Sequence, residues 1–264
     1  MKAILFDLDG VIYQEGRAIA GATAALDRMR SLGIPYLFLT NTSSRPRTAI
    51  CDRLAKLGIV VEPAQIHSPP VAAARWLQQQ QADAAVALFV PQATRTEFKA
   101  LQPWDGDPQN RVAAVVVGDL GEDWSFARLN EAFRCLMQHP APKLIALGMT
   151  RYWKTPEGLQ LDVGPFVSAL AYATGIKPTV IGKPAADFFA TAAAGLGVEA
   201  ADVLMVGDDI RGDVGGAQSA GMRGLLVRTG KYQPGDLDSD IHPDAILDSV
   251  ADLPRWWSDT VEQR

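Results

Sequence analysis

The stretch KAILFDLDG, residues 2–10, begins with an apolar run and ends in two acidic residues. The run over residues 2–6 is short and rich in Ile, Leu and Phe, which predicts a buried strand of the kind found in parallel sheets. Asp7 and Asp9 follow it at once. Ligands bind at the carboxyl ends of strands in parallel α/β sheets, so this stretch predicts both a fold class and the position of a site.

Outward from this stretch, short β-rich runs alternate with Ala- and Leu-rich helical stretches along the whole chain. That order is typical of an α/β fold with a mainly parallel sheet. The segment 62–70 is rich in proline and is expected to be a connection. We expect strands at 2–6, 35–39, 86–90, 112–117, 144–147, 180–181, 203–206 and 224–227, and helices at 22–32, 46–57, 71–80, 165–174, 185–195 and 214–220.

The chain has 264 residues, which corresponds to between one and two domains at about 150 residues each. The α/β pattern that begins at the N-terminus stops near residue 78 and returns near residue 178, and a smaller α/β unit lies between these positions. We therefore predict a doubly wound, mainly parallel Rossmann-like core made of residues 1–77 and 178–264, with residues 78–177 inserted as a second α/β domain. Within the insert, an apolar stripe at helical spacing is expected to face the core: Phe126, Leu129, Phe133, Leu136 and Met137.

Charge and composition disfavour several classes of protein. The 25 Lys and Arg against 30 Asp and Glu give a net charge of −5, which argues against a nucleic-acid coat or a basic membrane-surface protein. The apolar run at 84–90 is far shorter than the ~18 residues that a membrane-spanning helix needs. Acidic residues interrupt the apolar stretch at the N-terminus, and Cys51 and Cys135 fit reduced thiols. We therefore expect a cytoplasmic protein that binds neither nucleic acid nor membrane.

Polar residues follow four of the expected strands. Where such strand ends are neighbours, two unit charges ~4 Å apart repel by ~4 kcal/mol at an effective dielectric constant near 20. A hard divalent cation relieves that cost, and oxygen ligands with few committed protein groups suit Mg²⁺. The set comprises Asp7 and Asp9 after 2–6, Thr40 and Asn41 after 35–39, Lys183 after 180–181, and Asp208 and Asp209 after 203–206.

Each of these residue types has a role in phosphoryl transfer. Asp7 is suited to attack a phosphoryl group and form an aspartyl-phosphate. Asp9 is placed to protonate the leaving oxygen and later to activate water. Thr40 and Asn41 offer a hydroxyl, an amide and nearby backbone donors to phosphoryl oxygens, and Lys183 offers a positive charge.

Taken singly, each motif has a simpler interpretation. Asp-x-Asp is common in turns, Thr-Asn after a strand is ordinary turn and cap chemistry, and most lysines lie on the surface. The sequence Gly207-Asp208-Asp209 also fits a strand-to-helix turn, with Asp213 capping the helix that follows. The four polar segments together indicate a site, because each of them falls at an expected strand-to-helix junction.

In this order, the four segments resemble the motifs of the haloacid dehalogenase superfamily of phosphatases. The resemblance covers essentially the whole chain. The motifs are matched by Asp7 with Asp9, by Thr40, by Lys183, and by Asp208 with Asp209 and Asp213.

The resemblance implies a role for each acidic residue. Asp7 is implied as the nucleophile and a Mg²⁺ ligand. Asp9 is implied as the acid/base, whose backbone carbonyl also binds the metal, and Asp208 completes the protein ligands. Asp209 and Asp213 are left open as alternative ligands or as residues that support the ligands.

A finer resemblance is to a branch of the superfamily that inserts a large α/β cap between the second and third motifs, where the predicted insert lies. Members of that branch can carry serine at the second position of the first motif, where this chain has Asp9. A carboxylate there equips a site for ordinary phosphate esters with poor leaving groups. The segments that carry this resemblance are 162–166, 180–184, 206–218 and 227–231.

The cap of that branch is expected to decide the substrate. The loop at 148–154 resembles its substrate-facing loop, and Thr150 or Arg151 would contact the leaving group there, with Arg151 suited to an anion. A solvent-facing turn or a dimer contact is the alternative for this loop. Asp119 has the same two interpretations, specificity or a turn.

The leading hypothesis is a Mg²⁺-dependent phosphatase that transfers a phosphoryl group from a small substrate (a phosphate ester, pyrophosphate or a phosphoamidate) to Asp7 and then to water. One alternative is a phosphomutase of the same superfamily. Another is a non-catalytic phosphoacceptor resembling a response-regulator receiver, although a receiver needs less than half this length. The family resemblance also implies a homodimer formed through the cap.

Overall fold

The computed structural model describes residues 1–80, 85–155 and 157–260. The chain divides into two compact units. The first unit consists of Met1–Thr40, Thr48–His67 and the chain from Lys183 onward, and the second unit consists of Asn41–Arg47 and Ser68–Gly182. The first unit is thus built from both ends of the chain. Each unit has its own sheet and its own layer of helices.

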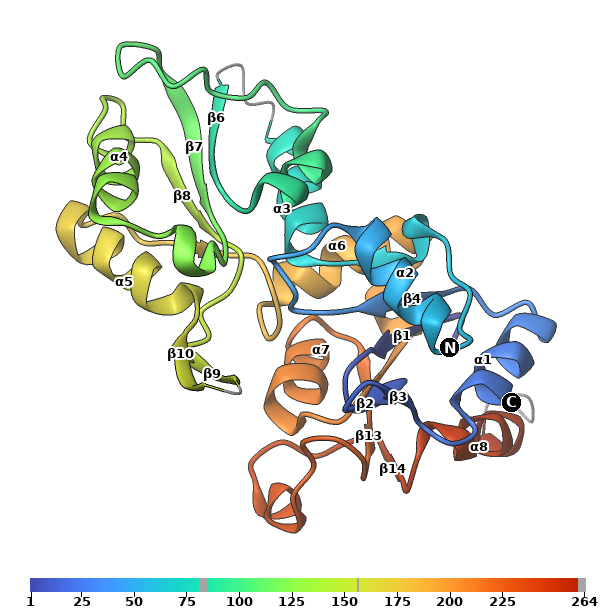
Figure 1. Cartoon of the computed structure of the whole chain (residues 1–264). Helices are drawn as coiled ribbons and strands as arrows, with labels where there is room; N and C mark the ends of the chain where they lie inside the picture. The colour runs from blue at the N-terminus through green and yellow to red at the C-terminus, as the bar shows by residue number, and fades with distance from the viewer. Residues whose placement is uncertain (81–84, 156, 261–264) are drawn as a thin grey trace. The chain divides into compact units, whose positions relative to one another are not determined.

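The first unit has a six-stranded sheet in which all neighbouring strands are parallel (Figure 1). The central strand β1 lies between β12 and β4, with Phe6 opposite both Val206 and Phe38. Nearly continuous apolar runs form these strands because both faces of the sheet are covered. The order is β14 (Ala245–Leu247), β13 (Arg223–Val227), β12 (Val203–Gly207), β1 (Ala3–Asp7), β4 (Tyr36–Leu39) and β5 (Ile66–His67).

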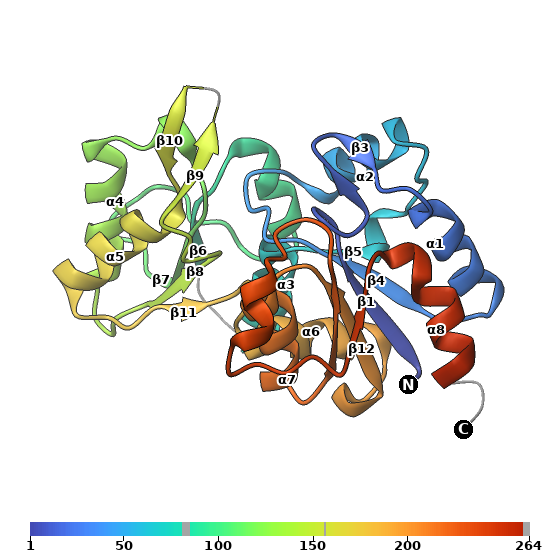
Figure 2. The same ribbon diagram turned by 90° about the horizontal axis from the view of Figure 1, so that it is seen from below.

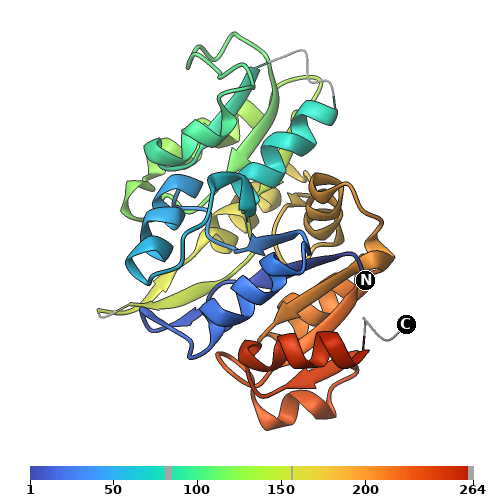
Figure 3. The ribbon, with the colours of Figure 1, turned by 90° about the vertical axis from the view of Figure 1, so that its right-hand side faces the viewer.

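Helices cover this sheet on both faces. On one face, α1 (Ala22–Ser31), α2 (Arg47–Lys56) and α8 (Leu253–Thr260) pack on alternate strand residues such as Phe6 and Phe38. Figures 2 and 3 show α1 and α8 side by side. The other face carries α6 (Ala186–Leu196) and α7 (Gly216–Ser219). Between β1 and α1 lies a short hairpin of β2 (Tyr13–Gln14) and β3 (Arg17–Ala18).

The second unit has a four-stranded parallel sheet in the order β11 (Thr179–Val180), β8 (Lys143–Ala146), β7 (Val112–Val117) and β6 (Ala85–Phe89). In Figure 1, α4 (Phe126–Leu136) and α5 (Val163–Thr174) cover one face, and α3 (Pro69–Gln79) lies on the other. An antiparallel hairpin of β9 (Tyr152–Thr155) and β10 (Gly158–Leu161) precedes α5.

Short helical turns complete the chain. Seven are present among the described residues: η1 (Pro63–Gln65), η2 (Gln92–Phe98), η3 (Gly121–Asp123), η4 (Ala200–Asp202), η5 (Ile210–Gly215), η6 (Pro234–Asp238) and η7 (Val250–Asp252). Of these, η5 is a π-helical turn and it follows β12 directly. None of the helices in the described ranges combines the length and the apolar character that crossing a membrane requires.

The structure confirms the predicted α/β fold class, with a parallel core sheet and a second parallel sheet inserted. Three local expectations were wrong. The segment 62–70 contains the edge strand β5, which has only two residues and leaves no pattern. The helix expected at 214–220 begins as η5. The stripe on α4 is only partly core, because Leu136 is buried but Phe126 is 83% exposed and Met137 is 48% exposed.

Candidate active site

The acidic residues meet at the carboxyl ends of β1 and β12. Asp7 is the last residue of β1 and Asp208 follows β12, and the parallel pairing of these strands places both ends at one edge of the sheet. Asp213, in η5, joins them. One carboxylate oxygen from each of Asp7, Asp208 and Asp213 lies within 4.8 Å of the other two, and all three residues are buried.

Lys183 lies among these carboxylates. Its Nζ is 2.6 Å from Asp7 Oδ1 and 2.7 Å from Asp213 Oδ1, and its side chain is 7% exposed. Burial by itself lowers the pKa of Lys183, but the charges of Asp213 and Asp7 outweigh that effect and raise the pKa. The lysine is therefore a permanently charged partner, and it is not the surface lysine that its residue type alone suggests.

The carboxylate of Asp208 is held by two loops. Its Oδ2 accepts a hydrogen bond of 2.6 Å from the backbone N–H of Lys231. Gly10 (φ 92°) and Gly230 (φ 62°) pass so close that a Cβ on either would collide with this carboxylate, and both have the left-handed backbone that favours glycine. Burial, followed by the charge of Asp7, raises the pKa of Asp208 to about 8.

Asp209 and Asp213, the other two acidic residues of the turn after β12, bind backbone N–H groups of that turn. Asp209 caps η5, accepting hydrogen bonds from the backbone N–H groups of Arg211 (3.1 Å) and Gly212 (2.7 Å). The capping residue is thus Asp209, and the alternative that Asp213 is the cap was wrong. Asp213 Oδ2 instead accepts from the backbone N–H groups of Asp208 and Asp209, both at 3.2 Å. Asp213 therefore fixes the conformation of the loop that carries Asp208.

Asp9 differs from the buried acids. It is exposed, and its carboxylate is not part of the cluster. Partial burial, followed by the charge of Asp7, raises the pKa of Asp9. A carboxyl group that keeps its proton above the usual range and still reaches solvent is suited to proton transfer.

The second predicted motif is split between the two units. Thr40 is buried in the first unit at the end of β4, beside β1, and its backbone N–H donates to the carbonyl of His67 at 3.2 Å. Asn41 belongs to the second unit, where its Oδ1 lies 3.3 Å from the position that a Cβ on Gly182 would take. Asp7, Thr40 and Asp208 therefore share one sheet edge, Lys183 joins them through its ion pair with Asp7, and Asn41 is described with the other unit.

The residues at this edge fit a divalent cation. Lys183 pairs with two of the three carboxylates, Asp7 and Asp213, and the third, Asp208, accepts from a backbone N–H. Asp208 Oδ1 is buried and has no hydrogen-bond partner in the described part of the chain. The donors near it are carboxylate oxygens, the ligands that Mg²⁺ prefers. Asp7 and Asp208 are the side chains with oxygen atoms best placed to hold the ion.

Lys231 also lies in the site, although the sequence motifs give it no role. Its backbone N–H binds Asp208, and its Nζ lies 3.3 Å from Asp209 Oδ2. Asp209 and, less directly, Asp7 raise the pKa of Lys231 against the effect of its burial. The sequence signal for this role is that Gly230 and Lys231 closely follow the expected strand at 224–227.

Comparison with known proteins agrees with this arrangement. The family model of haloacid dehalogenase-like hydrolases matches residues 4–102, and a second model of that type matches residues 180–253. The chain is 40% identical over 256 residues to the human phospholysine phosphohistidine inorganic pyrophosphate phosphatase, covering 96% of this chain and 91% of that protein. It is 42% identical over 247 residues to the bovine haloacid dehalogenase-like hydrolase domain-containing protein 2, covering 94% of this chain and 91% of that protein.

A solved structure adds the same conclusion for the fold. The p-nitrophenyl phosphatase of Archaeoglobus fulgidus superposes with a TM-score of 0.86 at 27% identity, covering 97% of this chain and 98% of that one. The chain belongs to the haloacid dehalogenase-like hydrolases. Within that family it is a phosphatase, which removes the receiver-like alternative.

A first prediction concerns the buried lysine. Lys183→Met should lower the free energy of unfolding by about 3–5 kcal/mol, because it leaves Asp7 and Asp213 buried without their counter-charge. Lys2→Met is the matched control, since Lys2 pairs with Asp202 at 2.8 Å on the surface and its loss should change stability little. Urea unfolding at pH 7 with a chelator measures both. Equal losses would contradict the assigned role of Lys183.

A second prediction concerns pH. The folded pKa of Asp208 is about 8, against about 3.9 for an ordinary aspartate, so between these values the folded chain binds a proton that the unfolded chain releases. The stability that Asp208 contributes is thus complete below about pH 4 and is lost as the pH rises to about 8. Urea unfolding of the metal-free chain at several pH values should show this loss relative to Asp208→Asn. Parallel pH profiles for the two proteins would exclude it.

Proposed function

We propose that this phosphatase hydrolyses small phosphorylated substrates with Mg²⁺, through a phosphorylated Asp7. The observation that supports this most directly is that Asp7 pairs with Lys183 and lies within 4.8 Å of the Asp208 carboxylate at one sheet edge. Residues 1–77 and 178–264 are proposed as the catalytic core and residues 78–177 as the cap. We also place the protein in the cytoplasm.

In the proposed reaction, Asp7 attacks phosphorus. A bond forms between a carboxylate oxygen and phosphorus while the bond to the leaving oxygen breaks, and Asp9 gives its proton to that oxygen. Asp9 then takes a proton from water, which attacks phosphorus and releases phosphate and the Asp7 carboxylate. Lys183 holds Asp7 Oδ1, which leaves Oδ2 for the attack. When bound, Mg²⁺ neutralises the negative charge that the phosphoryl group and the carboxylates share.

Two further residues are proposed to bind the transferred phosphoryl group. The Thr40 hydroxyl and the Asn41 amide offer donors to its oxygens, as the second motif of the family implies. Lys183 adds charge stabilisation from the same sheet edge. Asp213 and Asp209 are proposed to support the site and not to contact the metal, because each is committed to backbone N–H groups of its own loop.

The substrate class follows from Asp9 and from the cap. The human relative is named for phospholysine, phosphohistidine and inorganic pyrophosphate, and we extend the substrates of this chain to phosphate monoesters. A proton donor such as Asp9 matters most where the leaving group is a poor one. In the cap loop, Thr150 and Arg151 are exposed, and Arg151 lies over the ring of Tyr152 with 5.8 Å to its centroid. We propose these residues and Asp119 as specificity determinants.

The test of the function is hydrolysis of p-nitrophenyl phosphate, followed as released phosphate. Asp7→Asn should reduce kcat about a thousandfold or more, because it removes the nucleophile. A chelator should abolish the activity of the unchanged chain, and Mg²⁺ should restore it. Asp52→Asn, an exposed residue of α2, is the control and should keep full activity. Full activity of Asp7→Asn, or turnover without metal, would overturn the mechanism, and phosphate transferred to an acceptor would indicate a mutase.

The role of Asp9 makes a prediction about leaving groups. Asp9→Asn should lower kcat/KM for phenyl phosphate by about 10²–10⁴-fold, because phenolate needs the proton that Asp9 supplies. The loss with p-nitrophenyl phosphate should be much smaller, since nitrophenolate leaves without full protonation. Steady-state assays with both esters at pH 7 make the comparison. Equal losses would show that Asp9 does not donate this proton.

We further propose a homodimer that forms through the cap. Phe126, Leu129 and Phe133 of α4 line a shallow apolar surface together with Ala169 and Leu170 of α5, and Phe126 is 83% exposed. Covering such a surface with a second copy removes apolar area from water.

Phe126→Glu should therefore shift the mass measured by light scattering from dimer to monomer. Val60→Glu alters an apolar residue of the first unit that is 75% exposed, and it should leave the mass unchanged. A monomeric unchanged chain, or a dimer that persists in Phe126→Glu, would contradict the proposed interface.

A further inference from the structure

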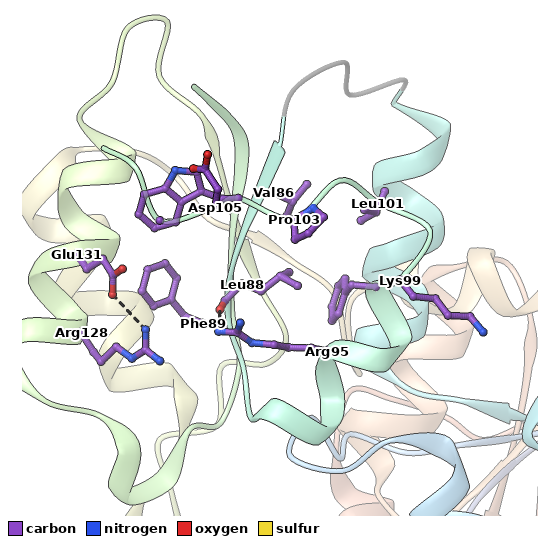
Figure 4. Close-up of a pocket in the computed structure, with 13 residues that line it drawn as sticks. Val86, Leu88, Phe89, Arg95, Lys99, Leu101, Pro103, Asp105, Arg128 and Glu131 are labelled. Atoms are coloured by element: carbon purple, nitrogen blue, oxygen red, sulfur yellow. Dashed lines mark hydrogen bonds and ion pairs between the residues drawn. The ribbon is translucent and has the colours of Figure 1, made fainter. Parts of the chain in front are cut away.

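The second unit contains a cavity of about 440 Å³ that no step of the phosphatase reaction uses. It lies beside β6, the edge strand of the four-stranded sheet, and its walls come from η2, the loop at 101–106 and α4 (Figure 4). Its volume falls within the range of sites for small organic ligands. All of its lining residues belong to one unit, so the cavity is complete in itself.

One wall of the cavity is aromatic and fixed. The backbone N–H of Trp104 donates to the carbonyl of Val86 at 3.0 Å, which attaches the loop to the edge of β6. The indole Nε1 donates to the carbonyl of Asp107 at 2.8 Å. Both ends of this residue are thus anchored, and Phe89 and Phe98 add further apolar surface. A flat apolar group is the shape that such a wall accepts.

The carboxylates of both acidic residues at the cavity already accept hydrogen bonds. Glu131 forms an ion pair of 3.2 Å with Arg128, and both belong to α4, as the dashed line in Figure 4 shows. The carboxylate of Asp105 accepts from the backbone N–H of Asp107 at 3.0 Å and from Asn110 Nδ2 at 2.7 Å. These hydrogen bonds lower the pKa of Asp105 and tie it to its own loop.

Among the described residues, no ion pair joins Arg95 or Lys99 to either of these acids. Figure 4 shows the Arg95 side chain reaching from η2 toward Leu88, whose carbonyl accepts from Nη2 at 3.2 Å. Arg95 Nε is buried and has no hydrogen-bond partner within the described ranges. Lys99 also lines the cavity and is exposed, and Figure 4 shows its ammonium group extending away from Arg95. A guanidinium whose charge meets a single carbonyl in a partly dehydrated cavity is stabilised by an anion placed opposite it.

We propose that this cavity binds an organic anion with a flat aromatic body, whose acidic group faces Arg95 and whose rings lie against Trp104, with Lys99 adding positive charge at the rim. The acidic group is a carboxylate, sulfonate or phosphate, since all three accept from a guanidinium. This site is separate from the residues of the phosphatase reaction, and its occupancy does not depend on Asp7.

The test uses the full chain and three probes that separate ring from charge. Naphthalene-2-sulfonate carries both, 2-naphthol carries the rings without charge at pH 7, and methanesulfonate carries the charge without rings. Calorimetric titration should show naphthalene-2-sulfonate binding at least tenfold more tightly than either of the others. Because none of the three carries phosphorus, phosphatase turnover cannot consume the probe.

Variants then assign the charge. Arg95→Met should weaken naphthalene-2-sulfonate binding about tenfold or more and remove its advantage over 2-naphthol. Lys99→Met should weaken naphthalene-2-sulfonate binding about threefold. Lys99 is exposed and, unlike Arg95, makes no hydrogen bond to Leu88 among those described, so its loss should not disturb the fold. Arg111→Met is the control, an exposed arginine of the same unit outside the cavity, and should bind as the unchanged chain does.

Three outcomes would overturn the proposal: no binding of naphthalene-2-sulfonate, equal binding of the sulfonate and 2-naphthol, or unchanged binding in both Arg95→Met and Lys99→Met. If Arg95→Met does not fold, Lys99→Met and the comparison of probes decide the question.

Discussion

Three buried carboxylates, two of which share one buried ammonium group, are the constraint on which this structure depends. Two unit charges about 4 Å apart repel by about 4 kcal/mol at an effective dielectric constant near 20, and Asp7, Asp208 and Asp213 lie within that order of distance. Lys183 balances one of these charges. Burial, followed by the charge of Asp7, raises the pKa of Asp208, and the cluster of carboxylate oxygens suits a cation. The positive charge of Lys183, 2.6 Å from Asp7 Oδ1, suits a nucleophile that must meet an anionic substrate.

The fold supplies the distances that this cluster needs. Adjacent parallel strands bring Asp7 and Asp208 to one edge, and the tight turn at η5 returns Asp213 beneath Asp208. Gly10 and Gly230 leave room for the Asp208 carboxylate where any side chain would occupy it. The candidate site is thus built from segments at both ends of the chain, so the second sheet can be inserted between them without interrupting the first.

Much of this was predictable from the sequence, because buried strands and their polar ends leave local patterns. The α/β class, the strand that ends in Asp7 and the strand before Asp208 follow from such patterns. The ion pairs of Lys183 and the hydrogen bond from Lys231 to Asp208 join residues far apart in the chain, and no local spacing encodes them. Periodicity indicated the apolar stripe on α4 but not that Phe126 would lie on its exposed side, since a stripe does not say how wide the covered face is.

We propose that the crowded acids make Asp7 the residue that takes the phosphoryl group. The most direct measurement is to quench the chain with acid during turnover of p-nitrophenyl phosphate with Mg²⁺ and to reduce it with borohydride, which converts an aspartyl-phosphate to homoserine. Mass spectrometry of the peptides should then find homoserine at position 7 and at no other aspartate. Homoserine at another position, or phosphate bound to a different residue type during turnover, would contradict the account.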